Sequence, residues 1–283
     1  MKALHRPEAI KNFIWALKKK KKKIGFVPTL GFLHEGHLSL VRRAKKENDA
    51  VVVSIFVNPL QFGPKEDLSR YPRDLKRDKR LLEKAKTDLL FVPEVKDFYP
   101  IDFQTSVSVC ALSRPLCGIS RPTHFAGVAT VVLKLLNFVQ PHVLYLGQKD
   151  YQQCCVIGQM VKDLGVSVSV RVMPIVRELD GLAMSSRNIF LTTAERQEAV
   201  LLYQSLQKCR RLIKEGCREI SKLKTTIKII LKGAPHARTD YIEIVNAETL
   251  ESMVNLNKGS EILIALAVYF SKTRLIDNIK IKV

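Results

Sequence analysis

The chain has 283 residues, 46% of them hydrophobic, and its 47 lysines and arginines against 27 acidic residues give a formal net charge of +20. This length favours two domains, and apolar runs such as Ile262 to Phe270 are well short of the roughly 20 residues that span a bilayer. Because no apolar stretch behind the N-terminal lysines could act as a secretory signal, we expect a cytoplasmic protein with no membrane partner.

Strands and helices alternate through the first two thirds of the chain. The strand Ile24 to Thr29 is predicted to lead through a glycine-containing turn into a helix that ends near Lys46. Further strands are predicted at Val51 to Val57, Leu89 to Val92, His142 to Leu146 and Ser167 to Val172, and further helices at Arg73 to Lys86, Phe125 to Val139 and Asp150 to Leu164. Such alternation implies parallel βαβ units. We therefore predict a Rossmann-like α/β domain over residues 1–175.

The pattern changes after Pro174. One long helix is predicted from Thr193 to Lys214 and another from Glu219 to Leu231, and three strand-like segments follow at Asp240 to Val245, Glu261 to Phe270 and Leu275 to Ile281. Short loops between these strands suit an antiparallel sheet beside helices. We predict a smaller α+β domain over residues 176–283, which would act as a lid.

The segment PTLGFLHEGH, residues 28–37, joins the first predicted strand to the first helix. Ligands of open α/β sheets gather at the carboxyl ends of strands, and backbone N–H groups at a helix start attract phosphate. Gly31 and Gly36 let the backbone approach a nucleotide, and His34 and His37 add side-chain donors. An ordinary glycine turn with a surface histidine pair is the alternative. The spacing of the histidines argues against the HExxH zinc pattern, which places them one residue further apart.

The second polar segment runs from Met184 to Asn188 and follows the turn residues Asp180 and Gly181. Serine hydroxyls and an arginine suit phosphate oxygens, because the guanidinium can bind two oxygens at once. Taken alone, the segment is also typical of a helix-capping loop. Together with the HxGH turn, it resembles the HIGH and KMSKS signatures of the nucleotidyltransferase superfamily, whose members transfer AMP or CMP from a nucleoside triphosphate.

Five strings then narrow the resemblance to one family: VPTLGFLHEGH, VVVSIFVNPLQFGPKEDLSRYPR, RPTHFAGVATVVLKL, LGQKDYQQ and DGLAMSSRN. Their order and spacing resemble those of the pantothenate synthetase (pantoate–β-alanine ligase, AMP-forming) family, over most of residues 24–191. The C-terminal third matches more weakly, mainly through the TRLIDNI string that begins at Thr273. The resemblance implies ATP-dependent condensation of pantoate with β-alanine to give pantothenate, AMP and pyrophosphate through a pantoyl-adenylate.

Residue roles follow from the same resemblance. It implies ATP contacts at Leu30, Gly31, Phe32, Leu33, His34, Glu35, Gly36, His37, Gly147, Gln148, Lys149, Asp150, Val176, Met184, Ser185, Ser186 and Arg187. It implies catalytic roles for His34, His37, Lys149, Ser185, Ser186 and Arg187, and binding of the pantoate and β-alanine substrates by Gln61 and Gln153. ATP would be a co-substrate accompanied by Mg²⁺, with no tightly bound cofactor and no metal site of the protein itself, and the chain would form a homodimer.

The implied chemistry needs orientation and charge neutralisation rather than a general base, because the pantoate carboxylate is already ionised at neutral pH. The adenylate must be shielded from water, and the segment Gly63 to Tyr71 and the Ser-Ser-Arg loop are expected to cover it. The residue that takes the proton of the amine stays open. Leu30 and Gln148 stand where the family usually has Met and Glu, and Cys117 stands where an LEG string is more typical, which puts a role for Cys117 in doubt.

Two other functions fit parts of the sequence. A different adenylyl- or cytidylyltransferase could use the same fold. An RNA-binding module could use the basic surface, but aromatic residues make up only 7% of the chain and stacking platforms are therefore not expected. The lysine run 18–23 ends a predicted helix, where cations are usually solvated. We therefore expect no nucleic-acid partner.

The six cysteines form no CxxC pair, which argues against zinc and disulfides.

Overall fold

A computed structural model describes residues 1–64 and 66–283 of the chain, so that Lys65, within the segment expected to cover the adenylate, lies outside the described residues. The chain folds into two compact units. The first comprises Met1–Ser113, Arg121–Gln148 and Gln153–Pro174, and the second comprises Arg114–Ser120, Lys149–Gln152 and Ile175–Val283. Domains at 1–175 and 176–283 stay a prediction.

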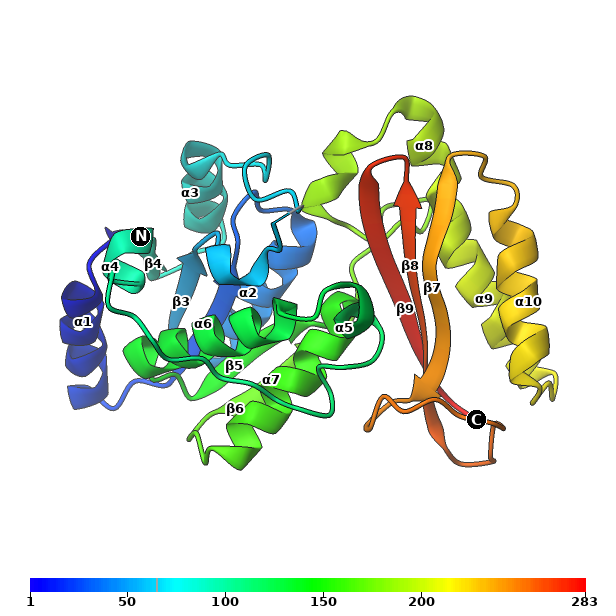
Figure 1. The fold of residues 1–283 in the computed structure, drawn as a ribbon. Helices are drawn as coiled ribbons and strands as arrows, with labels where there is room; N and C mark the ends of the chain where they lie inside the picture. The colour runs from blue at the N-terminus through cyan, green and yellow to red at the C-terminus, as the bar shows by residue number, and fades with distance from the viewer. Residues whose placement is uncertain (65) are drawn as a thin grey trace. The chain divides into compact units, whose positions relative to one another are not determined.

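A six-stranded parallel sheet forms the centre of the first unit, in the order β1-β4-β3-β2-β5-β6 (Figure 1). Its strands are β1 (Lys2–Leu4), β2 (Ile24–Thr29), β3 (Ala50–Ile55), β4 (Leu89–Phe91), β5 (Val143–Gly147) and β6 (Ser169–Met173). Every residue of β3 is buried, as the continuous run of β-branched and apolar residues predicts for a parallel strand covered on both faces. The predicted α/β fold class is confirmed.

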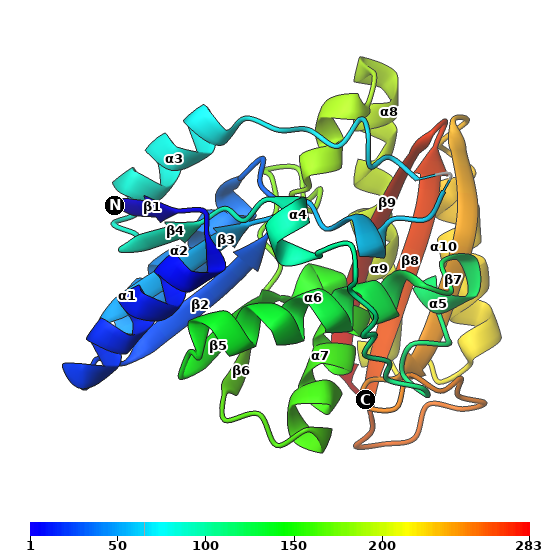
Figure 2. The same cartoon turned by 60° about the vertical axis from the view of Figure 1, so that its left-hand side comes forward.

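Helices cover both faces of this sheet (Figure 2). They are α1 (Pro7–Lys19), α2 (Glu35–Glu47), α3 (Leu75–Lys84), α4 (Val95–Phe98), α6 (His124–Val139) and α7 (Tyr151–Asp163), with 3-10 turns η1 (Pro59–Gln61) and η2 (Gln148–Asp150). On one face, Val27 and Val53 of the sheet share a core with Leu40 of α2 and Leu82 of α3. On the other, Phe91 of β4 contacts Phe138 of α6, with ring centroids 6.3 Å apart.

A three-stranded antiparallel sheet, ordered β7-β8-β9, forms the second unit together with its helices. The strands are β7 (Ala237–Asn246), β8 (Glu261–Phe270) and β9 (Thr273–Lys282), and the helices are α5 (Cys117–Ser120), α8 (Thr193–Glu198), α9 (Val200–Lys214) and α10 (Ile220–Leu231), with the 3-10 turn η3 (Ser186–Phe190). Leu206 of α9, Ile227 of α10 and Ile264 of β8 meet in one core. The predicted small antiparallel sheet is confirmed.

The structure corrects one predicted element and adds others. The single helix predicted from Thr193 to Lys214 is two helices, because the chain makes a tighter three-residue turn at Ala199, whose carbonyl accepts from the Leu202 N–H at 3.2 Å. The elements β1, α4 and α5 have only 3, 4 and 4 residues, too few to show a period. Pairing of β1 with β4 decides that the first of them is a strand.

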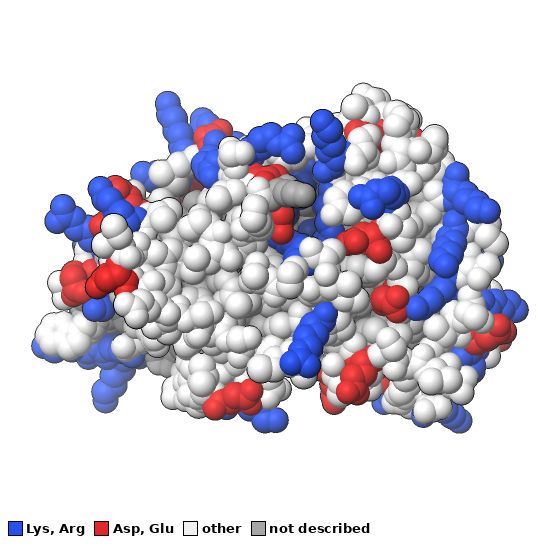
Figure 3. Space-filling view, viewed as in Figure 1, with Lys and Arg blue, Asp and Glu red and all other residues white. Residues whose placement is uncertain are grey.

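The positive charge is distributed rather than gathered into one site on the face drawn in Figure 3, where basic side chains lie among acidic and neutral ones. Several of the cations have local partners, such as Arg43 with Glu47 and Lys45 with Asp88. Among the described residues, no helix is both long enough and apolar enough to cross a membrane.

Candidate active site

The strand order of the first unit changes direction between β2 and β5. From β2 the chain proceeds outward to β3 and β4, and then returns to place β5 on the other side of β2, paired through Gly25 with Val143 and Phe26 with Leu144. Ligands of open α/β sheets bind beyond the carboxyl ends of the strands at such a switch point. The predicted ATP contacts that follow β2 and those at the end of β5 therefore lie on adjacent strand ends.

The turn between β2 and α2 leaves no room for a side chain at Gly31. Gly31 has φ +86°, and a Cβ at this position would come within 2.9 Å of a methyl carbon of Ile55. Phe32 also has a positive φ of 50°, which a non-glycine residue adopts only where its surroundings hold it. The N–H of Gly31 donates to the Thr29 hydroxyl at 3.2 Å. The turn is therefore held in one conformation by its neighbours.

The two histidines cap the helix that follows. The Gly36 N–H donates to Nδ1 of His34 at 3.2 Å, and the His34 N–H donates to Nδ1 of His37 at 3.3 Å. The two rings lie 4.1 Å apart between centroids. A ring nitrogen that accepts a hydrogen bond carries no proton, so the neutral rings hold theirs on Nε2. Both imidazoles are thus set as donors at the positive end of the α2 dipole.

Asp78 of α3 binds the backbone of the turn through its carboxylate. It was not predicted as part of the site. Its two carboxylate oxygens accept the N–H groups of Phe32 and Leu33, each at 2.8 Å, and its side chain is 1% exposed. Burial raises the pKa of Asp78, and the two backbone hydrogen bonds oppose that shift. Arg77 adds a bond from Nη1 to the Leu33 carbonyl at 2.9 Å. The sequence offered one signal for this role of Asp78, which is an acidic residue on the buried face of a predicted amphipathic helix.

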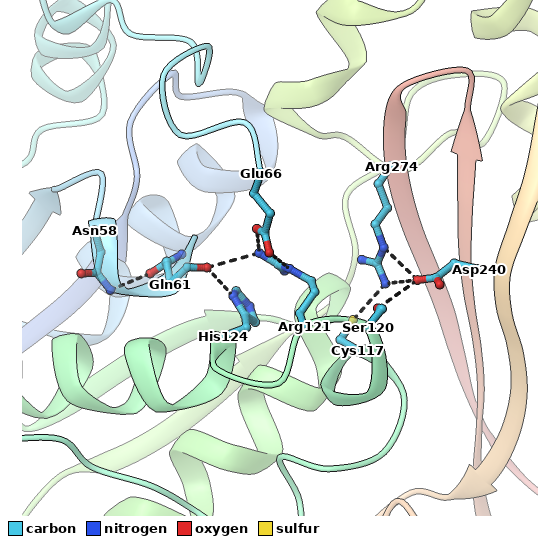
Figure 4. Close-up of polar contacts among 9 residues, drawn as sticks. All are labelled: Asn58, Gln61, Glu66, Cys117, Ser120, Arg121, His124, Asp240 and Arg274. Carbon is cyan, nitrogen blue, oxygen red and sulfur yellow. Dashed lines mark hydrogen bonds and ion pairs between the residues drawn. The ribbon is translucent and has the colours of Figure 1, made fainter. Parts of the chain in front are cut away.

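Gln61 lies on η1, and a neighbouring side chain orients its amide (Figure 4). Asn58, fully buried at the end of the segment after β3, donates from Nδ2 to Gln61 Oε1 at 3.2 Å and to the Gly127 carbonyl at 3.1 Å. The Tyr99 hydroxyl donates to Asn58 Oδ1 at 3.0 Å. Because Oε1 of Gln61 accepts from Asn58, its amide nitrogen is left as the donor toward a ligand. Asn58 was not predicted as part of the site.

The second predicted amide, Gln153, lies in the first turn of α7 and is half-buried. Both glutamines belong to the first unit, as do the ATP contacts predicted from Leu30 to His37 and at Gly147 and Gln148. Binding of the substrates by these two glutamines stays a prediction.

In the second unit, a short hairpin carries the Ser-Ser-Arg segment. The Met184 N–H donates to the Val176 carbonyl at 3.0 Å, and Gly181, with φ +97°, closes the turn. Arg177 binds Asp277 of β9 through its two terminal guanidinium nitrogens, Nη1 and Nη2, at 2.7 and 2.9 Å. The Asp277 side chain is 1% exposed, so this charge depends on its partner. The TRLIDNI string therefore anchors the hairpin.

The residues after the hairpin form η3. The Ser185 hydroxyl accepts the Arg187 N–H at 3.2 Å, and Ser186 is buried. Asn188 donates to Glu178 at 3.1 Å and to the Ala183 carbonyl at 3.2 Å. Serine and asparagine thus fix the backbone of the segment, as the capping interpretation predicted, while Arg187 stays half-buried.

Lys149 also belongs to the second unit, and so does Asp150. The Lys149 carbonyl accepts from Asn278 Nδ2 at 2.9 Å. Asn278 follows Asp277 on β9, and the Asn278 N–H donates to Asp277 Oδ1 at 2.7 Å. One strand therefore holds both the backbone of Lys149 and the hairpin that leads to Arg187. Convergence of these residues with the two histidines on one triphosphate stays a prediction.

Cys117, whose role the sequence leaves in doubt, is part of a polar cluster in the second unit. Its Sγ lies 3.3 Å from the Tyr241 hydroxyl and 3.5 Å from Nη2 of Arg274. Arg274 binds Asp240 at 2.8 Å, and the Ser120 hydroxyl contacts the same carboxylate at 3.2 Å (Figure 4). Burial, and then the neighbouring Cys117, raise the pKa of Tyr241. The cluster attaches α5 to β7 and β9.

Among residues 1–64 and 66–283, no group of three or more His, Cys, Asp or Glu side chains is placed to hold a metal ion.

A parallel sheet with a glycine turn and a capped helix start at its switch point defines a nucleotide-binding α/β protein. The sequence model of the family described as pantoate-beta-alanine ligase matches residues 2–280. The chain belongs to this family and is an enzyme of its kind.

Similar proteins and solved structures agree with this family assignment. The chain is 53% identical to pantothenate synthetase of Thermotoga neapolitana over 278 residues, which are 98% of this chain and 99% of that protein. Pantothenate synthetase from Thermus thermophilus superimposes with a TM-score of 0.94 at 44% identity, covering 100% of both chains. Pantoate-beta-alanine ligase from Francisella tularensis, solved as a complex with beta-gamma ATP and beta-alanine, gives a TM-score of 0.80 at 38% identity, covering 99% of this chain and 97% of that one.

Proposed function

We propose that this chain joins pantoate to β-alanine in two steps, with a pantoyl-adenylate between them, and releases pyrophosphate and then AMP. Family membership over residues 2–280 supports the overall reaction. The observation that supports the site is the pair of imidazoles held at the start of α2, beyond the carboxyl end of a central strand. Positioned donors at this place suit the phosphates of a nucleotide.

In the first step, a pantoate carboxylate oxygen attacks the α-phosphorus of ATP, and pyrophosphate leaves. His34 and His37 donate to phosphate oxygens, His37 being the main donor as charge develops. Lys149, Ser185, Ser186 and Arg187 stabilise the pentavalent centre and the departing pyrophosphate. This assignment requires His37 of the first unit and Arg187 of the second to reach the same triphosphate.

Pantoate binds through the amide groups of Gln61 and Gln153. Asn58 supports this role for Gln61, because it occupies Oε1 and so presents the amide nitrogen to the carboxylate or hydroxyl groups of the substrate. The remaining ATP contacts are those implied by the family resemblance, from Leu30 to His37, at Gly147, Gln148 and Asp150, and at Val176 and Met184. Leu30 keeps the pocket wall apolar.

Mg²⁺ enters with ATP, and its charge offsets that of the phosphates. We expect the phosphates rather than the protein to hold it. The enzyme acts as a homodimer in the cytoplasm, where its six cysteines, all free in the structure, would stay reduced.

The test follows ATP–pyrophosphate exchange while each substrate is omitted in turn. Exchange that depends on pantoate but not on β-alanine is expected, and AMP release is expected only when β-alanine is added. Exchange without pantoate, or transfer of AMP to a final dinucleotide product, would instead support a different nucleotidyltransferase. Retention of RNA without ATP turnover would support the RNA-binding alternative.

A further inference from the structure

An ion pair in the first unit lies directly against Gln61. Arg121, three residues before α6, donates from Nε to Glu66 Oε1 at 2.9 Å, and its Nη2 contacts the second oxygen of the same carboxylate. Nη2 also donates to the Gln61 carbonyl at 3.3 Å. Figure 4 shows the guanidinium between Glu66 and Gln61. One arginine thus binds a carboxylate with two nitrogens while it is tied to the backbone of a predicted substrate-binding residue.

The pair is partly open to solvent. The side chains of Arg121 and Glu66 are 17% and 24% exposed, whereas Gln61 is 9% exposed. Burial by itself would raise the pKa of Glu66, but the hydrogen bond and the charge of Arg121 keep it below its ordinary value. His124 contacts the Gln61 carbonyl through Nδ1 at 2.8 Å. The Gln61 carbonyl therefore contacts both His124 and a guanidinium whose partner is a carboxylate from a neighbouring loop.

We propose that Arg121 is the receptor for the carboxylate of β-alanine and that Glu66 occupies it until the amino acid displaces that side chain. The inference rests on the proposed function. β-Alanine must bring its amine to the acyl group bound near Gln61, and its carboxylate, at the other end of a short chain, needs a cationic partner nearby. A guanidinium matches a carboxylate with two parallel hydrogen bonds, and Glu66 occupies the guanidinium in this manner.

The assignment predicts opposite effects for the two partners. Loss of Arg121 removes the receptor, so the KM for β-alanine should rise on the order of 10- to 100-fold, the range for hydrogen bonds to a charged group. Loss of the Glu66 charge removes the internal competitor, so that KM should fall by about threefold or more, because a larger fraction of the enzyme can then bind substrate. A purely structural ion pair would predict a loss of function for both changes.

The experiment measures the KM for β-alanine in the full-length chain and in Arg121→Ala, Arg121→Lys and Glu66→Gln. n-Propylamine, which matches β-alanine but lacks its carboxylate, serves as a second acceptor. The unmodified enzyme should prefer β-alanine strongly, and this preference should shrink in Arg121→Ala by about the factor lost in KM. Lys45→Gln, which breaks the Lys45–Asp88 pair elsewhere in this unit, is the control and should change neither value.

Pantoate-dependent pyrophosphate exchange in the unmodified chain is measured alongside, and its absence would reject the proposed function itself. With exchange present, an acceptor preference in Arg121→Ala or Arg121→Lys that stays within about twofold of the unmodified value overturns the receptor assignment. A KM for β-alanine that rises in Glu66→Gln overturns the proposed displacement of Glu66 by the substrate. Glu66→Gln also tests the proposal if the arginine variants fail to fold.

Discussion

His34 and His37 each use Nδ1 to cap the helix whose positive end they share, so that one side chain carries both a structural and a chemical role. The Nδ1 atoms accept backbone N–H groups at 3.2 and 3.3 Å, so a neutral ring carries its proton on Nε2. The two roles can be separated, because asparagine places an amide oxygen near the Nδ1 position and glutamine places an amide nitrogen near the Nε2 position.

His37→Ala is expected to slow pantoate-dependent pyrophosphate exchange on the order of 10²-fold, the scale for a lost transition-state donor. His37→Gln should retain more exchange than His37→Asn, whereas His37→Asn should retain more stability because it keeps the acceptor for the His34 N–H. Single-turnover exchange and denaturant unfolding measure the two effects. Near-normal exchange in His37→Ala would reject the role of His37.

Asp78 makes the turn before α2 depend on pH. Its pKa is raised in the folded state above its ordinary value of 3.8, so the stability that this group contributes is fully present below its unfolded pKa and is lost as the pH rises through its folded pKa. The difference in unfolding free energy between the unmodified chain and Asp78→Asn should therefore fall between about pH 4 and pH 7. Urea unfolding at both pH values checks this. A difference that grows with pH would show a lowered pKa instead.

At the scale of elements, α6 and η1 meet without a side chain between them. A Cβ at Gly127 would lie 2.1 Å from the Leu60 carbonyl oxygen and 2.7 Å from the Gln61 nitrogen. The helix thus positions the backbone of the turn that carries Gln61, and the Asn58 bond to the Gly127 carbonyl adds to this contact.

Gly127→Ala should therefore destabilise the chain by about 1–3 kcal/mol, as overpacking does, and should raise the KM for pantoate by displacing Gln61. Gly158→Ala in α7 is the matched control, since a Cβ there meets nothing within 4 Å, and it should stabilise by up to about 1 kcal/mol through helix propensity. Thermal unfolding and steady-state kinetics distinguish them. An unchanged pantoate KM in Gly127→Ala would argue against this positioning.

At the scale of the whole molecule, the absence of a nucleic-acid partner for a chain with a formal charge of +20 stays a prediction. The lysine run 18–23 ends α1, and Lys18 and Lys22 contact Gln140 and Asp49. Cations at a helix C-terminus offset the helix dipole. The local contacts and the helix dipole therefore favour lysines at this end of α1.

Replacing Lys19, Lys20 and Lys21 together by glutamine should leave ligase turnover within about twofold of the original. The same change should let the chain elute from a heparin column at lower salt, because fewer cations remain to bind a polyanion. Turnover and elution salt are measured on the same preparation. A tenfold or greater loss of turnover would instead assign the run a role in the reaction.

The sequence by itself determined the alternation of strands and helices, the two sheets, the turn that carries the histidines and the family. Each of these depends on residues close together in the chain: a period within one element, glycines in a turn, or a contiguous motif. The tertiary structure alone decided which distant side chains support that turn and the Ser-Ser-Arg segment. Asp78 meets Leu33 across 45 residues, and Arg177 meets Asp277 across 100, and no local pattern specifies such a pairing because it depends on how whole elements pack.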